Sequence, residues 1–337
     1  MPNGEDTYLP QSGASLGDQG DEVQRLQDYL RRFGYLEGPD DAYAPLRSAA
    51  RAPRAEDGTF DEATLVGLRH FQRFAGLPVT GELDDATIAQ MSRPRCGFPD
   101  RPVGGVPAAP SSAGEQVSSF VAQGNRWPTS NLSYGFQEIT QDLPANTVRA
   151  AIVAAFNLWA QAAPLTFTES PNPQIVIRFV TGNHGDGSPC DGPGAVLAHA
   201  FYPPPNGGDI AGDTHFDDAE TWTVALPVPA GGFDLVTVAA HEFGHALGLA
   251  HSDDPAALMY PFYSGPHRHL AADDSLGIQT IYGSNLRVVP GWFGNEDQGA
   301  DIAVADINGN GRQELLVFHV DNPGGENHGW YRVISDL

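Results

Sequence analysis

The segment H-E-F-G-H-A-L-G-L-A-H, residues 241–251, places three histidines and a glutamate at spacings that suit a metal ion. His241 and His245 are four residues apart, so on a helix their imidazoles share one face and can reach one ion. Gly248 can end that helix in a left-handed conformation, which brings His251 back from another direction. Three neutral imidazoles leave zinc an open position for water, as in catalytic rather than structural sites. We therefore predict a catalytic zinc held by these three histidines.

Glu242 follows the first histidine and is predicted to face the zinc-bound water, where it would act as the general base. The plainer alternative is an ordinary amphipathic helix that carries three histidines. A bare His-Glu-x-x-His pattern is only moderately specific, whereas the eleven-residue form with Gly248 and a third histidine is far more specific. The sequence therefore favours a catalytic zinc site that activates water.

Composition limits the other classes of function. A chain of 337 residues suggests two or three domains. With 18 basic and 42 acidic residues the formal charge is −24, which argues against binding to nucleic acid phosphates. Such acidity suits a soluble protein that binds divalent cations, although it often reflects solubility alone. No apolar run is long enough to span a bilayer, and two cysteines cannot form a disulfide framework.

The elements that must hold these residues follow from hydrophobic periodicity. Residues 15–92 read as helices with apolar residues at helical spacing and predicted N-caps at Asp21 and Asp61. Their apolar positions are Val23, Leu26, Leu30, Phe33, Leu65, Leu68, Phe71 and Phe74. Residues 102–123 are rich in Pro, Gly, Ala and Ser, as in an exposed linker. From Trp127 the pattern mixes strands with helices, including a helix whose buried face carries Val148, Ile152, Phe156 and Trp159 and another near 272–282.

The stretches HGDGSPCDGPGAVLAHAF, GDTHFDDAETW, HEFGHALGLAHS, ALMYPFY and DDSLGIQTIYG resemble the matrixin catalytic domain, a metzincin. The helical segment DEVQRLQDYLRRFGYLEG resembles a peptidoglycan-binding-like module, and PRCGFPD closely matches the cysteine switch of matrixin zymogens. The resemblance implies an α+β fold, in which an all-α three-helix prodomain precedes a zincin domain with a twisted, mostly parallel sheet and three helices. We expect an N-terminal tail (1–14), the prodomain (15–92), the switch and activation linker (93–125), the catalytic domain (126–284) and a partial β repeat (285–337).

Cys96 lies within the switch segment. A thiolate is a strong zinc ligand at about 2.3 Å, so it can take the position that the catalytic water needs and keep the enzyme latent. The resemblance implies that Arg95 and Asp100 pair and hold the loop. The alternatives are a buried structural cysteine or a disulfide to Cys190, which stands where the family usually has an aromatic residue.

Further metal sites are expected between residues 184 and 220. One carboxylate and three imidazoles suit a closed structural zinc site, although a polar surface loop would carry similar residues. The expected zinc ligands are His184, Asp186, His199 and His215. The side chains of Asp191, Asp217 and Glu220, with the carbonyls of Gly192, Gly194 and Val196, suit calcium. A second family calcium site keeps Asp213 but has Gln174 where an Asp is expected, and Asp209 replaces a usual glycine.

The resemblance also implies a substrate cleft. Met259 would lie in the Met-turn beneath the histidines. Leu197 and Ala198 would belong to an edge strand that binds substrate antiparallel. Thr237 and Val238, with the wall segment Pro261, Phe262 and Tyr263, would line a deep pocket for a large apolar side chain after the scissile bond. His267 and His269 are expected to be solvated loop residues and not a metal pair.

The tail sequence DIAVADINGNGRQELLVFHV resembles an FG-GAP or VCBS-type repeat. Its expected calcium ligands are Asp306, Asn308, Asn310, the Arg312 carbonyl and Glu314. One such repeat cannot bury its own faces, so we expect the natural protein to continue beyond this segment.

These features favour a secreted zinc endopeptidase made as a latent zymogen, with protein or peptide substrates and its own prodomain as inhibitor. The helical module would also allow contact with cell walls. The first residues lack the features of a signal peptide, so either the protein stays inside the cell or its leader is missing from this sequence. The alternatives are a cell-wall-binding protein without peptidase activity, a calcium-dependent adhesion protein and a zinc peptidoglycan hydrolase.

Overall fold

The computed structural model describes residues 9–36, 55–100, 125–205 and 208–285, and the backbone of four strands between 287 and 334. The helices are α1 (Asp21–Arg32), α2 (Glu62–Phe74), α3 (Asp85–Met91), α4 (Ala145–Ala162), α5 (Leu235–Ala246) and α6 (Ala272–Tyr282). The strands up to α5 are β1 (Arg95–Cys96), β2 (Asn131–Phe136), β3 (Thr166–Glu169), β4 (Ile175–Val180), β5 (Val196–Ala200), β6 (Thr214–Asp217), β7 (Trp222–Thr223) and β8 (Phe233–Asp234). Among the helices described, none has the length and apolar character needed to cross a membrane.

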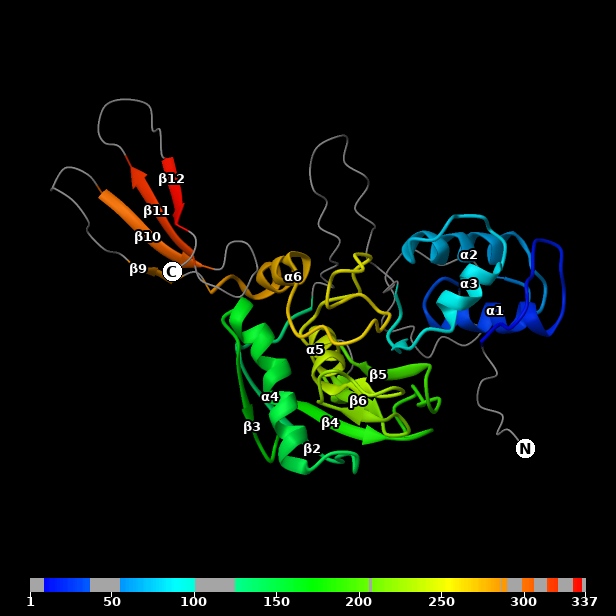
Figure 1. Ribbon diagram of the computed structural model, residues 1–337, viewed down its shortest axis with the longest axis horizontal. Helices are drawn as coiled ribbons and strands as arrows, with labels where there is room; N and C mark the ends of the chain where they lie inside the picture. Colours follow the sequence, from blue (N-terminus) through cyan, green and yellow to red (C-terminus); the bar gives the residue numbers. More distant parts are fainter. Residues whose placement is uncertain are drawn as a thin grey trace.

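The first three helices gather into one module, drawn in blue and cyan in Figure 1. Its core contains the predicted apolar residues of α1 and α2, among them Leu26, Leu30, Leu68 and Phe71. Helix α2 begins as predicted, because the Asp61 carboxylate accepts a hydrogen bond from the Thr64 amide at 2.8 Å.

The predicted start of α1 is wrong by one residue. Gly20, with φ of 124°, is the N-cap, and Asp21 is the first helical residue. A carboxylate in the first turn is still favourable there, because it faces the positive end of the helix dipole.

The larger sheet confirms the mostly parallel architecture expected for residues 126–284. Its strand order is β1-β5-β6-β4-β2-β3. The pairs β2–β3, β2–β4, β4–β6 and β1–β5 are parallel, and only β5–β6 is antiparallel. Strand β1, which carries Cys96, forms one edge of this sheet next to β5.

Helices α4 and α5 pack against each other beside the sheet (Figure 1). The predicted apolar face of α4 is buried, and its Phe156 ring stacks on Phe243 of α5 with ring centroids 3.8 Å apart. The indole nitrogen of Trp159 donates to the Ala240 carbonyl at 2.9 Å. Every residue of α5 is buried. These contacts fix the helix that carries His241, Glu242 and His245.

The C-terminal part contains a four-stranded antiparallel sheet in the order β12-β11-β10-β9. Its strands are β9 (Arg287–Val289), β10 (Gly299–Ala305), β11 (Glu314–Val320) and β12 (Trp330–Ile334). The expected calcium residues Asp306, Asn308, Asn310 and Arg312 lie outside the described residues, and only the backbone of Glu314, the first residue of β11, is described. The calcium hypothesis for this tail therefore stays a prediction.

Candidate metal centre and substrate cleft

Helix α5 and the turn after it bring the three histidines of the long motif together. The helix begins at the N-cap Asp234, which accepts the Thr237 amide at 3.1 Å, and its last residue is Ala246. Gly248 then adopts φ of 106°, as the sequence predicts for the end of this helix, and its amide donates to the His245 carbonyl at 2.8 Å. The chain reverses there, so that His251 returns toward the helix.

Four side chains converge on one point. Ligand atoms of Cys96, His241, His245 and His251 all lie within 4.8 Å of one another. The Nδ1 atoms of His241 and His245 lie 2.8 Å and 2.7 Å from the Leu258 and Leu249 carbonyl oxygens. A carbonyl oxygen can only accept a hydrogen bond, so the Nδ1 of each ring must carry the proton. The Nε2 of each ring then keeps a lone pair that can bind a cation.

The polar atoms at this point fit a bound cation. The Nε2 atoms of His241 and His251 are buried and have no hydrogen-bond partner among the described residues. A buried polar atom without a partner costs about 1–3 kcal/mol, which coordination to a cation would remove. Burial lowers the pKa of His241 to about 4 and lowers the pKa values of His245 and His251 well below the ordinary value. The imidazoles are therefore neutral, as metal binding requires.

Glu242 is fully buried beside this group but does not belong to it. Its Oε2 lies 3.5 Å from Cys96 Sγ, and its Oε1 has no hydrogen-bond partner in the described parts of the chain. Burial raises the pKa of this carboxyl to about 8. A carboxyl with one unpaired oxygen next to the histidines has the geometry expected of a general base.

Strand β1 delivers Cys96 by pairing on both of its sides. On one side the Gly97 amide donates to the Ala198 carbonyl of β5 at 2.8 Å. On the other, the Cys96 amide donates to the Pro261 carbonyl at 2.9 Å, and the Tyr263 amide donates to the Pro94 carbonyl at 2.8 Å. The Cys96 sulfur lies 3.5 Å from His245 Nε2. The switch segment therefore covers the edge of β5 where a peptide substrate is expected to add as a strand.

Arg95 and Asp100 form a buried ion pair, as the resemblance implied. The Arg95 guanidinium lies over the Phe33 ring at 3.5 Å and over the Phe262 ring at 4.6 Å. The Tyr35 hydroxyl of the helical module donates to Asp100 at 2.8 Å. The ion pair therefore joins the helical module to the wall of the expected substrate pocket.

Three contacts at this centre were not found by sequence reasoning. The Phe98 ring stacks on His245 with centroids 4.7 Å apart and 28° between the planes. Asp100 Oδ1 lies 3.0 Å from His251 Nδ1, but the two atoms are not aligned for a hydrogen bond. The Asp274 carboxylate accepts the amides of Leu258 and Met259 at 2.7 Å and 3.0 Å. The only sequence feature that pointed to any of these contacts is the PRCGFPD motif, which contains Phe98 and Asp100.

Met259 packs against helix α5 at Gly244. A side chain on Gly244, between the two helical histidines, would collide with the Met259 sulfur. The neighbouring Leu258 carbonyl orients His241, and Asp274 holds this turn through its two amides. The turn therefore positions His241, one of the candidate zinc ligands.

A pocket that is partly open to solvent is lined by residues that include Cys96 and Glu242. The predicted substrate residues that line it are Leu197, Thr237, Val238, Pro261, Phe262 and Tyr263. Ala198 pairs with Cys96 in the β1–β5 ladder instead. His267 also lines the pocket and is partly buried, so the expectation that it is a solvated loop residue is wrong; His269 is exposed.

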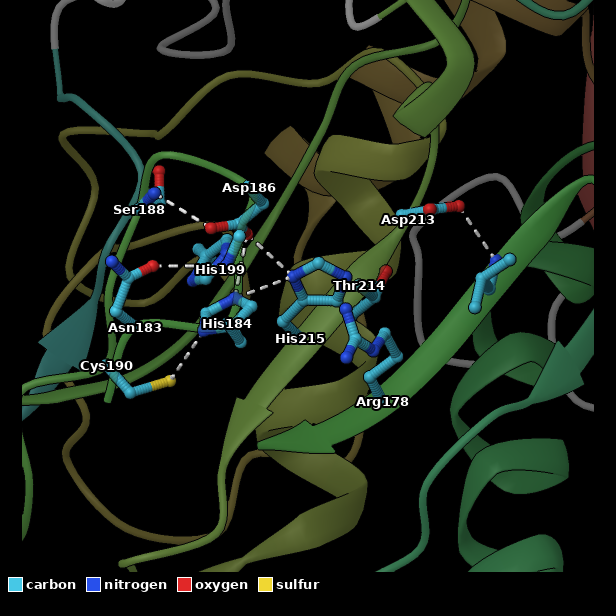
Figure 2. A network of polar contacts seen from close by, with 12 residues as sticks. Arg178, Asn183, His184, Asp186, Ser188, Cys190, His199, Asp213, Thr214 and His215 are labelled. Carbon is cyan, nitrogen blue, oxygen red and sulfur yellow. Dashed lines mark hydrogen bonds and ion pairs between the residues drawn. The ribbon is translucent and has the colours of Figure 1, made fainter. Parts of the chain in front are cut away.

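A second cluster forms around one carboxylate oxygen (Figure 2). Asp186 Oδ2 lies 2.8 Å from His184 Nε2, 2.7 Å from His199 Nε2 and 2.7 Å from His215 Nδ1. Burial raises the pKa of Asp186, but the hydrogen bonds from His199 and His215 outweigh it and hold the pKa well below the ordinary value. The four groups predicted for a structural zinc are thus brought together.

Cys190 lies beside this second cluster. Its sulfur is 4.0 Å from His184 Nδ1 (Figure 2). Both Cys96 and Cys190 are free, so the alternative of a disulfide between them is not what the structure contains. Burial, with the charges of Asp217 and Asp191, raises the pKa of the Cys190 thiol far above its ordinary value. Burial therefore favours the protonated form of this thiol.

The residues expected to bind calcium shape the loop before β5. The Asp191 carboxylate accepts the Val196 amide at 3.1 Å, Asp217 accepts the Gly192 amide at 2.9 Å, and Glu220 accepts the Gly194 amide at 2.7 Å. Burial raises the pKa of Glu220 to about 7, and the neighbouring carboxylates add to the shift. In the described residues, only the two histidine clusters gather three or more ligand atoms within 4.8 Å. Calcium therefore stays a prediction.

At the expected second calcium site, the side-chain oxygens of Asp213 and Gln174 accept hydrogen bonds from the backbone. Asp213 accepts the Val176 amide at 3.0 Å, and Gln174 accepts the Ser133 amide at 3.1 Å. These contacts tie β4 to its neighbours and leave this site a hypothesis.

Comparison with known proteins agrees with this geometry. Residues 126–283 match the family described as Matrixin, and residues 19–91 match "Putative peptidoglycan binding domain". The chain is 42% identical to interstitial collagenase of Equus caballus over 269 residues, which are 78% of this chain and 50% of the collagenase. It is 38% identical to matrix metalloproteinase-16 of Mus musculus over 277 residues, 79% of this chain and 42% of that protein. It is 41% identical to neutrophil collagenase of Homo sapiens over 266 residues, 77% of this chain and 50% of that protein.

The chain thus spans about half the length of these curated relatives or less. Its matched regions contain the long histidine motif and the three-helix module described above. The chain belongs to the matrixins, a family of zinc metalloendopeptidases.

Proposed function

We propose that this protein is a secreted zinc endopeptidase made as a latent zymogen, in which Cys96 closes the catalytic site. The observation that carries the proposal is the position of β1. Its backbone pairs with β5 on one side and with residues 261–263 on the other, while its thiol lies among the three histidines. The same segment thus covers the edge of β5 where substrate would bind and fills the position beside the three histidines where the catalytic water would lie.

The catalytic residues follow from the same geometry. His241, His245 and His251 would hold the catalytic zinc. A zinc ion in such a site polarises the scissile carbonyl and lowers the pKa of water toward about 7. Glu242, whose Oε1 is unpaired within the described chain, would accept the proton of the attacking water and pass it to the leaving amine.

The direction of the switch strand supports its role as an inhibitor rather than a substrate. β1 runs parallel to β5, whereas a substrate is expected to bind antiparallel to β5. The chain at Cys96 therefore crosses the site in the reverse direction from a bound substrate. Gly97 allows the close approach, because a Cβ there would lie 2.6 Å from Val196 Cγ1.

Two further metal sites belong to the proposal. A structural zinc would bind His184, Asp186, His199 and His215, where the ligand atoms already converge. Calcium would bind at Asp191, Asp217 and Glu220. Asp217 and Glu220 are buried, and the charges of Asp217 and Asp191 add to the raised pKa of Glu220, which a bound cation would offset. Arg32 of the helical module lies 3.5 Å from Asp191, so this loop also contacts the inhibitory part of the chain.

The test is metal analysis of the intact chain together with a peptide-cleavage assay before and after activation by an organomercurial. We expect about two zinc ions per chain, no cleavage before activation and cleavage of peptides afterwards. A protein that binds cell walls but cleaves no peptide after activation, with zinc retained, would show that the peptidase proposal is wrong. Digestion of wall material instead of peptides would identify a peptidoglycan hydrolase.

A further inference from the structure

One carboxylate links the zinc-binding helix to the loop that closes the substrate pocket. Asp234, the N-cap of α5, is completely buried. The Arg268 Nε atom donates to Asp234 Oδ2 at 2.9 Å, and Arg268 Nη2 donates to Oδ1 of the same carboxylate. The guanidinium also donates to the Val224 carbonyl at 2.9 Å. Arg268 thus joins the pocket loop, the start of α5 and the segment after β7.

Two other hydrogen bonds reinforce the connection. The Thr237 hydroxyl donates to Asp234 Oδ2 at 2.6 Å and accepts the His267 amide at 2.7 Å. The Asp234 amide donates to the Tyr263 hydroxyl at 3.0 Å. Thr237, Tyr263 and His267 all line the pocket. The wall and the loop of the pocket are therefore both anchored at Asp234.

We propose that the Asp234–Arg268 ion pair is a positioning device that fixes the pocket loop, residues 264–270, and thereby sets the preference for large apolar substrate side chains. The proposal rests on the proposed peptidase function and adds the residue that controls its selectivity. Arg268 acts through the loop and needs no contact with substrate. Because the loop is already held in place, it does not have to be ordered when a large side chain binds, and this lowers the entropic cost of binding.

The pair has the features of a fixed latch. A bidentate guanidinium–carboxylate pair is directional, and a buried carboxylate that loses its cation is left uncompensated. Lysine at 268 would keep the charge but not the two-point geometry. Asparagine at 234 would still cap α5, because Asn and Asp are nearly equal as N-caps, but it would lose the charge. These variants therefore separate the role of Asp234 in the ion pair with Arg268 from its role as the N-cap of α5.

The first measurement is hydrogen exchange of the intact chain, which needs no activity. In Arg268→Ala the amides of residues 264–270, including the His267 amide, should exchange at least about tenfold faster, while those of α5 stay unchanged. Arg149→Ala, which removes an exposed ion pair with Glu169, is the matched control. Unchanged exchange of the loop in Arg268→Ala would overturn the proposal.

The second measurement is the cleavage of matched peptides that carry leucine or alanine after the scissile bond, by the activated protein. In Arg268→Ala the leucine-to-alanine ratio of kcat/KM should fall about tenfold, mainly through a higher KM for the leucine peptide. Arg268→Lys should restore part of the ratio. Asp234→Asn should have the same effect, and the double variant should be no worse than either single variant.

The two failures are distinguishable. Activated wild-type protein that cleaves neither peptide would contradict the peptidase function, whereas the exchange experiment would still decide whether the latch exists. Wild-type protein that prefers leucine, with a ratio unchanged in Arg268→Ala, would overturn the latch as the source of selectivity. Zinc content should equal the wild-type value in every variant.

Discussion

The sulfur of Cys96 lies 3.5 Å from Glu242 Oε2 and also 3.5 Å from His245 Nε2. One atom of the switch thus faces both the candidate base and a candidate zinc ligand. Burial and the nearby Glu242 carboxylate raise the pKa of this thiol well above its ordinary value, whereas a cation at the histidines would favour the thiolate. The inhibition we propose therefore depends on zinc, and it engages the two groups that catalysis needs.

Glu242→Ala should abolish peptide cleavage in the activated protein. A general base typically contributes about 10² to 10⁴ in rate, so kcat should fall at least about a hundredfold. Zinc content and thermal unfolding should stay close to wild type, because the residue is not in the ligand group. His241→Ala is the matched comparison and should lose the catalytic zinc. Retention of most activity by Glu242→Ala would contradict the assigned role.

Arg95→Ala should weaken latency without touching Cys96. Its removal leaves the buried Asp100 carboxylate without a cation, and breaking such a pair costs about 3–5 kcal/mol. It also removes the guanidinium between Phe33 and Phe262. We expect measurable cleavage by the intact, untreated variant. Arg93→Ala is the control and should stay latent. The Arg93 guanidinium lies 5.5 Å from the Phe262 ring, but among the described residues it has no buried carboxylate partner. Full latency of Arg95→Ala would show that the ion pair does not hold the switch.

Removal of calcium with a calcium-selective chelator should lower the melting temperature of the intact chain. Asp191, Asp217 and Glu220 would then repel one another, and a ligand that binds only the folded state stabilises it by mass action. At a hundred times its dissociation constant, calcium contributes about 2.7 kcal/mol, or roughly 5–10 °C for a domain of this size. Glu220→Gln should reduce the shift. A melting temperature that does not change, with calcium loss shown by elemental analysis, would argue against the site.

Thr237→Leu should reverse the size preference of the pocket. The small Thr237 side chain lines the pocket, and a larger side chain would fill the space that a bulky substrate residue needs. The leucine-to-alanine ratio of kcat/KM should fall about tenfold or more. Thr237→Val keeps the volume but loses the hydroxyl contacts with Asp234 and His267, so it separates pocket size from loop anchoring. A peptide library that shows the same preference in Thr237→Leu and wild type would exclude this role.

The sequence predicted those parts of the site that depend on spacing within one element. His241 and His245 share a helix face because they are four residues apart, and Gly248 turns the chain because it adopts a positive φ. The mostly parallel sheet and the three-helix module followed from the family resemblance and were confirmed.

Contacts between distant segments could not be predicted in this way. Asp274 supports the Met259 turn from 15 residues away, and Arg268 reaches Asp234 across 34 residues. No periodicity or local motif records such pairings, because they arise only when separate elements pack. His267 was misjudged for the same reason, since its partial burial depends on the loop folding back to α5. The N-cap of α1 was misplaced because an aspartate is favourable at either of two adjacent positions.

The most direct test of the account compares peptide cleavage by intact wild-type protein and intact Cys96→Ser, each with its free thiols titrated. Cys190→Ser in both backgrounds makes the titration report on Cys96 alone. We predict that the wild type is inactive with an unreactive Cys96 until an organomercurial is added, and that Cys96→Ser is active at once, because a serine hydroxyl is a far weaker zinc ligand than a thiolate. Full activity of the intact wild type, with Cys96 free and titratable, would contradict the switch.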